Sequence, residues 1–210
     1  MAVPHFDDAF RQGLIDLFAW RRDVRRFRTD ALPQGLLDRL LALANDAPSV
    51  GLSQPWRFIT VDDPARRGAI VANFECCNQA ALALQPEERA GLYARLKLAG
   101  LNEAPVHLAV CVDPSTGKGG GLGRLTQPEM IGYSAVLAIH TLWLAARSEG
   151  VGLGWVSIID PAGVLRTLDL PPDWRLVGYL CLGYPLTPSE VPELERVGWE
   201  RRAAIPVLRR

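Results

Sequence analysis

Residues 128–148, PEMIGYSAVLAIHTLWLAARS, form the longest helical pattern in the chain, and their apolar side chains occur almost all round the expected helix. Such a helix is typically buried, so we expect it to lie at the centre of the domain. VHLAVCV (106–112) is a near-continuous apolar run, as expected of a strand buried on both faces. LVGYLCL (176–182) predicts a second buried strand. The three stretches together predict a core of one buried helix and buried strands.

The rest of the chain adds helices and strands that do not alternate strictly. Apolar periodicity and helix-start signals predict helices at residues 7–20, 33–45, 63–82, 86–101 and a short one from Pro161, and strands at 56–61 and 155–159. No low-complexity linker separates them. We therefore expect one α+β domain over residues 1–210 rather than a doubly wound sheet. The proline-rich tail from residue 184 has too little apolar surface to fold alone and must lie against this subunit or a partner.

Composition excludes several classes of function. The 210 residues carry 23 Lys+Arg and 23 Asp+Glu, so no net charge attracts nucleic acid or anionic lipid. No apolar run approaches the roughly 20 residues of a membrane span, and the N-terminus is acidic where a signal peptide is basic. We expect a cytoplasmic protein without nucleic-acid or membrane partners. The four cysteines lack C-x2-C spacing and the three histidines are scattered, which predicts buried, reduced thiols and no protein-bound metal.

An arginine cluster, RRDVRRFR (21–28), is the strongest candidate for chemistry. Five arginines within eight residues of a neutral chain need an anion, and guanidinium groups bind phosphate in bidentate fashion. Asp23 lies inside the cluster, where the guanidiniums favour its charged form and prepare it as an acceptor or base. A solvated basic turn paired with acidic neighbours explains the cluster as well, so the residues alone leave both readings open.

Two glycine-rich stretches do not meet the requirements of nucleotide-binding loops. GVGLG (150–154) follows a helix and precedes a strand, whereas a dinucleotide fingerprint needs the reverse order. GKGGGLGR (117–124) lacks the spacing of a P-loop and the Ser or Thr after its lysine. We expect a helix stop and a flexible surface loop.

RRDVRRF (21–27) followed by APSVGLSQPWRF (47–58) resembles the flavin signature of the nitroreductase superfamily. There the first motif holds the FMN phosphate and pyrimidine edge, and the second lies beside the flavin, commonly across a dimer interface. Further motifs resemble the 5,6-dimethylbenzimidazole synthase family: LKLAGLNEAP (96–105), LWLAARSEGVGLGWVSI (142–158), LCLGYP (180–185) and PELERVGW (192–199). The resemblance spans roughly residues 10 to 200. It implies a nitroreductase-like fold with a central mixed β-sheet surrounded by helices, a lid at about 85–101 and a C-terminal extension at 184–210.

The resemblance also implies a flavin-destroying oxidoreductase. Such an enzyme uses O2 to fragment FMNH2 into 5,6-dimethylbenzimidazole, the lower ligand of vitamin B12, and erythrose 4-phosphate. FMNH2 would be consumed as a substrate, with NAD(P)H acting indirectly through a separate flavin reductase, and the enzyme would be a homodimer. Typical nitroreductases carry serine where this chain has Asp23. In the synthase family this aspartate and the serine of GWVSI, here Ser157, are tied to catalysis.

Residue types suggest the role of each implied site residue. The arginines would clamp the phosphate and the N1–C2=O edge of the reduced flavin. Asp23 would act as a base or direct the oxygen chemistry, and Ser157, which has no neighbouring histidine to activate it, would donate a hydrogen bond. The FMN contacts implied by the resemblance are Arg21, Arg22, Asp23, Val24, Arg25, Asn45, Ser157, Ile158 and Gly198.

Two other functions fit the same motifs. One is an NAD(P)H-dependent FMN nitroreductase or flavin reductase, which would use the flavin repeatedly. Asp23 disfavours this alternative, because a carboxylate should discourage hydride donors and repel anionic substrates. The other is a non-enzymatic flavin-binding or interaction protein in which the arginines serve adhesion alone.

Overall fold

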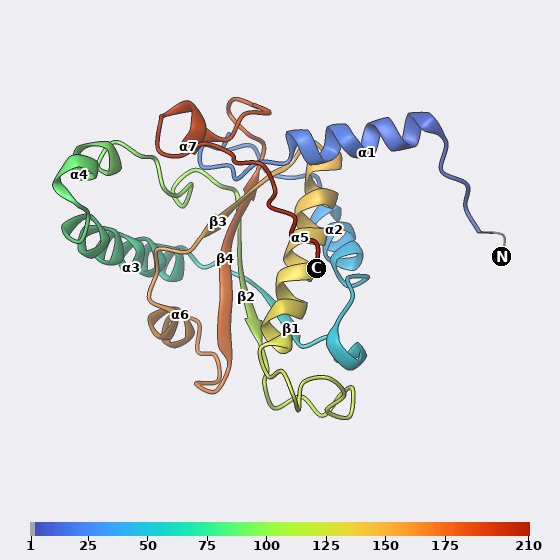
Figure 1. Ribbon diagram of the computed structural model, residues 1–210. Coiled ribbons are helices and arrows are strands. Elements are labelled where there is room, and N and C mark those ends of the chain that lie inside the picture. The colour runs from blue at the N-terminus through green and yellow to red at the C-terminus, as the bar shows by residue number, and fades with distance from the viewer. Residues whose placement is uncertain (1–2) are drawn as a thin grey trace.

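The computed structural model describes residues 3–210 and contains a four-stranded sheet (Figure 1). The strands are β1 (Trp56–Thr60), β2 (Val106–Val112), β3 (Gly152–Val156) and β4 (Arg175–Gly183), in the order β1-β2-β4-β3. The expected α+β class is confirmed, but each neighbouring pair of these strands is antiparallel, so the expectation of a mixed sheet is wrong for them. β2 and β3 run in the same direction, but β4 lies between them and prevents a parallel pair.

Helices cover both faces of the sheet, as the apolar character of β2 and β4 requires. Leu108 and Leu180 pack with the helices on one face, α2 and α5, whereas Ala109 and Tyr179 pack with α3 and α6 on the other (Figure 1). Because successive strand residues point to opposite faces, each of these strands serves both layers. The helices are α1 (Asp8–Trp20), α2 (Leu36–Ala44), α3 (Pro64–Ala83), α4 (Glu87–Tyr93), α5 (Met130–Ser148), α6 (Pro161–Thr167) and α7 (Glu193–Arg196), with a 3-10 turn at Val50–Leu52.

The long apolar pattern forms the central helix α5. Its 19 residues and mean hydropathy of 1.2 are sufficient for a membrane span, so the expectation that no run comes near this length is wrong. Seven of its side chains are buried, and they pack against the sheet and α2. The helix is apolar because it lies between two elements of the same domain.

Three expectations about element limits and cysteine burial differ from the structure. The strand predicted at 155–159 lies instead at Gly152–Val156, and Ser157 follows it. The helix predicted at 86–101 ends at Tyr93; further along the same stretch, Gly100 packs so closely on Phe27 that a Cβ there would lie 2.4 Å from the Phe27 ring. The four cysteines are free thiols, but only Cys111 and Cys181 are buried; on α3, Cys76 is exposed and Cys77 is half-buried.

The C-terminal extension packs on its own subunit over its first half. The amide of Arg28 donates to the Tyr184 carbonyl oxygen at 2.8 Å, and the Trp199 ring meets the Tyr93 ring at a centroid distance of 6.1 Å. Residues 201–210 are exposed and contain no helix or strand. The extension therefore joins the arginine-rich segment to α4, and its final residues project from the body.

Candidate active site

The arginine-rich segment leaves α1 in an extended conformation and runs along the sheet. The Val24 amide donates to the Leu153 carbonyl oxygen of β3 at 3.0 Å, and Asp23 forms an isolated parallel bridge with the same residue. Phe27 then pairs with Pro185, just beyond β4. Because the main chain is fixed at both points, the side chains between them have defined directions.

Gly152 and Gly154 allow the segment to approach β3 this closely. A Cβ at Gly154 would lie 2.1 Å from the Val24 carbonyl oxygen, and one at Gly152 would lie 2.7 Å from Val24 Cγ2. Neither position could carry a side chain unless the segment moved. Gly150, with φ of 75°, ends α5 as predicted. The GVGLG stretch is therefore a packing surface, and the Val24 side chain, an implied FMN contact, packs on that surface.

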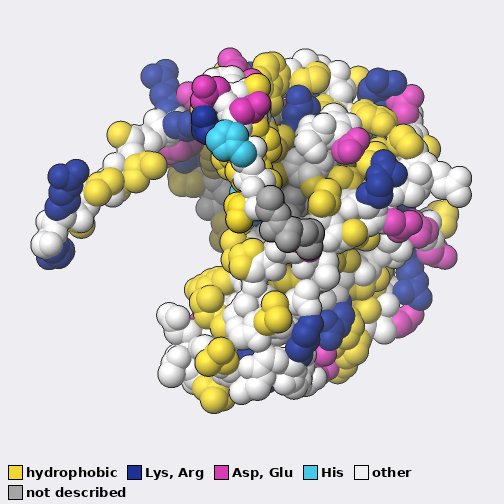
Figure 2. Space-filling view, turned by 90° about the vertical axis from the view of Figure 1, so that its right-hand side faces the viewer, with side chains coloured by type: hydrophobic (Ala, Val, Ile, Leu, Met, Phe, Trp, Pro, Cys, Tyr) yellow, Lys and Arg dark blue, Asp and Glu magenta, His cyan; other side chains and the backbone are white. Residues whose placement is uncertain are grey.

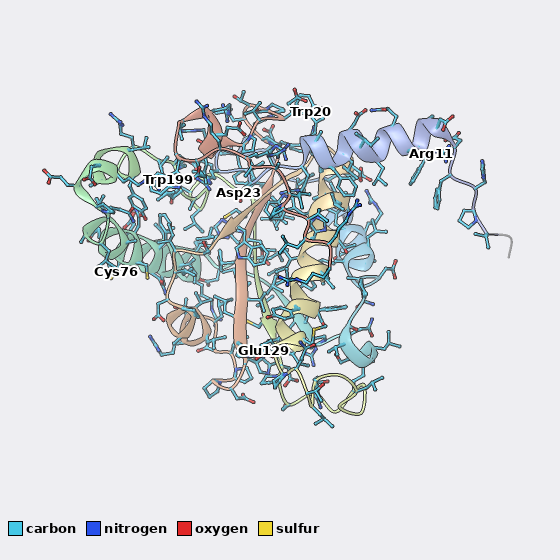
Figure 3. All side chains as sticks on the ribbon, in the orientation of Figure 1. Arg11, Trp20, Asp23, Cys76, Glu129 and Trp199 are labelled. Atoms are coloured by element: carbon cyan, nitrogen blue, oxygen red, sulfur yellow. The ribbon has the colours of Figure 1, made fainter. Side chains whose placement is uncertain are left out.

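Two hydrogen bonds hold the carboxylate of Asp23, the residue labelled near the centre of Figure 3. Oδ1 accepts from the Trp155 amide of β3 at 2.9 Å, and Oδ2 accepts from Arg25 Nε at 2.8 Å. Arg25 Nη1 also donates to the Lys97 carbonyl oxygen at 3.3 Å. The Asp23 side chain is 31% exposed and that of Arg25 only 14%. The carboxylate is thus fixed in position while one part of it stays open to a ligand.

Positive charge around Asp23 exceeds the negative charge that the protein supplies there. Arg21, Arg22 and Arg25 share a hollow of about 180 Å³ with Arg202 of the tail, and Glu193 is the other acid in its lining. Burial, and then the charge of Arg202, lower the pKa of Arg21 and of Arg22. This mutual repulsion is the condition in which a bound dianion is most favourable. Sequence reasoning missed Arg202, although the Arg201–Arg202 pair in the tail was a visible signal.

Ser157 and Asp23 are both connected to β3. Ser157 is the first residue after the strand, two positions beyond the Trp155 amide that binds the Asp23 carboxylate. It is exposed, and Ile158 beside it is half-buried. The structure therefore attaches the Asp23 carboxylate to β3 at a position two residues before Ser157.

Asn45 lies elsewhere in the subunit. It follows α2, and its Oδ1 accepts from the Trp56 indole at 3.3 Å beside a separate open hollow of about 630 Å³. The loop after Asn45 is anchored near the start of α5, where the Val50 amide donates to Ser134 Oγ at 3.0 Å. The arginine-rich segment is anchored near the end of α5, where the Trp143 indole donates to the Arg22 carbonyl oxygen. Ser134 and Trp143 are nine positions apart along α5, which corresponds to roughly 13 Å of helix. Within one chain, Asn45 and Asp23 belong to different sites.

The expected lid lies beside the arginine cluster, whereas Gly198 follows α7 and is not among the residues that line the arginine hollow. Gly198 has φ of 77° just after α7, and Trp199 packs on α4 (Figure 3). Within the expected lid, residues 98–100 pack beside Asp23 and Arg25, and the space between them holds no cavity of measurable volume. Any ring placed there would have to move this segment. No group of three or more His, Cys, Asp or Glu side chains within residues 3–210 is placed to hold a metal ion.

Comparison with known proteins identifies related sequences and structures. The sequence pattern of the Nitroreductase family matches residues 18–184. A 5,6-dimethylbenzimidazole synthase from Rhodospirillum rubrum is 58% identical, covering 99% of this chain and 98% of the relative. One from Rhodobacter capsulatus is 46% identical, covering 93% and 95%. The crystal structure of an iodotyrosine deiodinase bound to FMN and 3-iodo-L-tyrosine superposes with a TM-score of 0.72 at 28% identity, covering 94% of this chain and 97% of that one.

The fold and the sequence similarity define an enzyme of the flavin-dependent oxidoreductase class, and the chain belongs to the Nitroreductase family. Within that family it falls among the 5,6-dimethylbenzimidazole synthases, which it matches over nearly its whole length.

Proposed function

We propose that this chain uses O2 to fragment FMNH2 into 5,6-dimethylbenzimidazole and erythrose 4-phosphate, consuming the flavin as its substrate. Identity of 46–58% to synthases of that name supports the reaction. The observation that carries the proposal is the Asp23 carboxylate, fixed by the Trp155 amide and Arg25 within the arginine cluster. The reaction takes place in the cytoplasm, where a separate flavin reductase supplies FMNH2 by reducing FMN with NAD(P)H.

The arginine-lined hollow has the charge that an FMN phosphate requires. Arg21, Arg22 and Arg25 would hold the phosphate and the electron-rich edge of the ring, with Arg202 closing the hollow from the tail. Burial and, after it, the charge of Arg202 lower the pKa of Arg21 and Arg22, and a dianion placed among these groups would offset both effects. Reduced flavin supplies the electrons for the reaction with O2. The protein supplies binding and orientation.

Asp23 and Ser157 have complementary roles in this proposal. The Asp23 carboxylate accepts a proton from the substrate, and its two hydrogen bonds keep it aimed while this happens. Ser157 donates a hydrogen bond where negative charge develops, and Ile158 packs beside it. Residues 98–100 of the lid move aside for the ring and then exclude water from it.

Use of the same site as an NAD(P)H-dependent nitroreductase is not favoured. A fixed carboxylate stands where such enzymes carry a neutral serine, and it would repel an anionic hydride donor. The chain's similarity to named synthases over more than nine-tenths of its length points the same way.

The central experiment combines the protein with FMN, NADPH, a flavin reductase and air. We expect the flavin absorbance to fall irreversibly while a benzimidazole product accumulates. Ser157→Ala is expected to lower the rate of benzimidazole formation about 100-fold, the usual cost of losing one well-placed donor, with FMN affinity little changed. Ser148→Ala, at the exposed end of α5, is the matched control. Flavin that cycles unchanged while a nitroaromatic is reduced would favour the nitroreductase instead.

A homodimer forms part of this proposal, because α1 carries apolar side chains that its own subunit leaves largely exposed. None of its residues is buried, and Phe10, Leu14 and Phe18 are 49%, 37% and 48% exposed. Figure 2, in which α1 points toward the viewer, shows further hydrophobic side chains on the projecting C-terminal tail and around the broad hollow beneath it. A second copy that covers this surface would also bring its own Asn45 loop towards the arginine cluster, which accounts for the separation of Asn45 from Asp23 within one chain.

Charge placed on the apolar face of α1 tests the dimer. Phe10→Glu with Leu14→Glu is expected to yield a monomer with greatly reduced activity, measured by size-exclusion chromatography with light scattering. Burying two carboxylates without partners costs several kcal/mol. Gln12→Glu, which lies on the opposite, polar face, should stay dimeric. A doubly substituted protein that stays dimeric would place the interface elsewhere.

A further inference from the structure

Asn73 of α3 binds the main chain just beyond Ser157. Its Oδ1 accepts from the Asp160 amide at 2.8 Å, and its Nδ2 donates to the Asp160 carbonyl oxygen at 3.1 Å. The side-chain amide thereby satisfies both polar groups of one peptide residue, as a neighbouring strand would. Gly163 is adapted to this contact, since a Cβ there would lie 2.5 Å from Nδ2.

The turn that carries Ser157 is supported at both ends, and Asn73 is one of the two supports. At the first end, Val156 pairs with Tyr179 as the last residue of the β3 ladder. At the second end, Asp160 caps α6 and is fixed to α3 through Asn73. The Asp23 carboxylate is bonded to the Trp155 amide of β3, the strand that precedes this turn. The path of the turn after β3 therefore sets where Ser157 lies relative to that carboxylate.

We infer that Asn73 is a positioning residue for Ser157: it fixes the turn at residues 157–160 so that the serine hydroxyl faces the same ligand as Asp23. The inference rests on the proposed role of Ser157. The same helix also binds the lid, because Asn78 Oδ1 accepts from the Tyr93 hydroxyl of α4 at 2.9 Å. α3 is thus a common support for the lid helix and for the serine turn, and Asn73 is its contact with the turn.

The test uses Asn73→Asp and Asn73→Ala in the full chain, with Gln79→Ala on an exposed position of the same helix as control. Asn73→Asp keeps the shape and the acceptor but removes the donor to Asp160. Both Asn73 variants are expected to fold, to bind FMN with unchanged Kd, and to lower kcat about tenfold. When Ser157 is already replaced by alanine, the same Asn73 substitutions should lower kcat less than about twofold. The effects of two substitutions are not additive when one residue acts through the other. Hydrogen exchange of residues 157–163 should be faster in both variants and unchanged in Gln79→Ala.

Several outcomes would overturn the inference. Wild-type kcat in the Asn73 variants, an equal loss in the Ser157→Ala background, or unchanged hydrogen exchange would each remove Asn73 from this role. Failure of both variants to fold would assign it to stability alone. A Ser157→Ala enzyme of full activity would instead count against the proposed function, and the exchange data would then show separately whether Asn73 holds the turn.

Discussion

Replacing Asp23 with asparagine is expected to lower the rate of benzimidazole formation about a thousandfold, within the range observed for loss of a general base. The amide keeps the volume of the carboxylate, so FMN binding should change little. It has only one oxygen, whereas Asp23 uses one oxygen for the Trp155 amide and the other for Arg25 Nε. An NH2 group placed against either donor cannot pair with it. Charge and alignment are therefore lost together.

The measurement is a single turnover: FMN is reduced anaerobically on the enzyme, air is admitted, and the benzimidazole is quantified by chromatography. Asp30→Asn is the matched control, because Arg28 Nε also donates to Asp30 Oδ2 at 2.8 Å, two residues apart as in the Asp23 pair. That pair is exposed and outside the hollow, so full activity is expected. Equal product from Asp23→Asn and wild type would refute the role of the carboxylate.

Arg25→Ala should weaken FMN binding by about 1.5–3 kcal/mol, the usual size of a charge-assisted hydrogen bond, or roughly 10- to 150-fold in Kd. Arg25 is the least exposed member of the Asp23 pair, and it also ties the motif to the lid through the Lys97 carbonyl oxygen. Its removal leaves Asp23 Oδ2 without this partner, so kcat should fall as well. Quenching of FMN fluorescence gives the Kd.

Two comparisons sharpen the Arg25 result. Arg25→Lys keeps the positive charge but cannot bind an anion in bidentate fashion, so its affinity for FMN should lie between those of wild type and Arg25→Ala. Arg28→Ala, which breaks the equivalent exposed pair, should bind FMN normally. An Arg25→Ala protein that binds FMN like wild type would place the phosphate away from this guanidinium.

Both predictions depend on a segment that is neither a helix nor part of the sheet. Residues 21–27 are extended, and they keep their place because β3 offers glycines where the segment crosses it. The catalytic geometry is therefore built by close backbone contact. We expect side chains introduced at Gly152 or Gly154 to damage the site without touching the ligand.

Much of the fold could be predicted from local sequence. The buried strands, the central helix and α1 follow from apolar periodicity, and these elements lie within a few residues of the predicted limits. Two predicted elements have other limits in the structure. Residues 155–159 and 86–101 have acceptable strand and helix patterns, but the strand lies at Gly152–Val156 and the helix at Glu87–Tyr93. Val24 and Phe27, distant in sequence, pack closely against Gly154 and Gly100 in these regions. Periodicity contains no information about such contacts.

The sequence by itself determined the chemistry available: an arginine cluster with one carboxylate, a serine after a glycine-rich stretch, and motifs shared with flavin enzymes. It could do so because charge, donor type and motif spacing are properties of residue identity. Only the tertiary structure decided which of these groups meet. It joined Asp23 and Ser157 through β3, added Arg202 from the tail, and separated Asn45 by much of the length of α5. Those distances depend on packing between segments more than a hundred residues apart along the chain, and no local pattern specifies them.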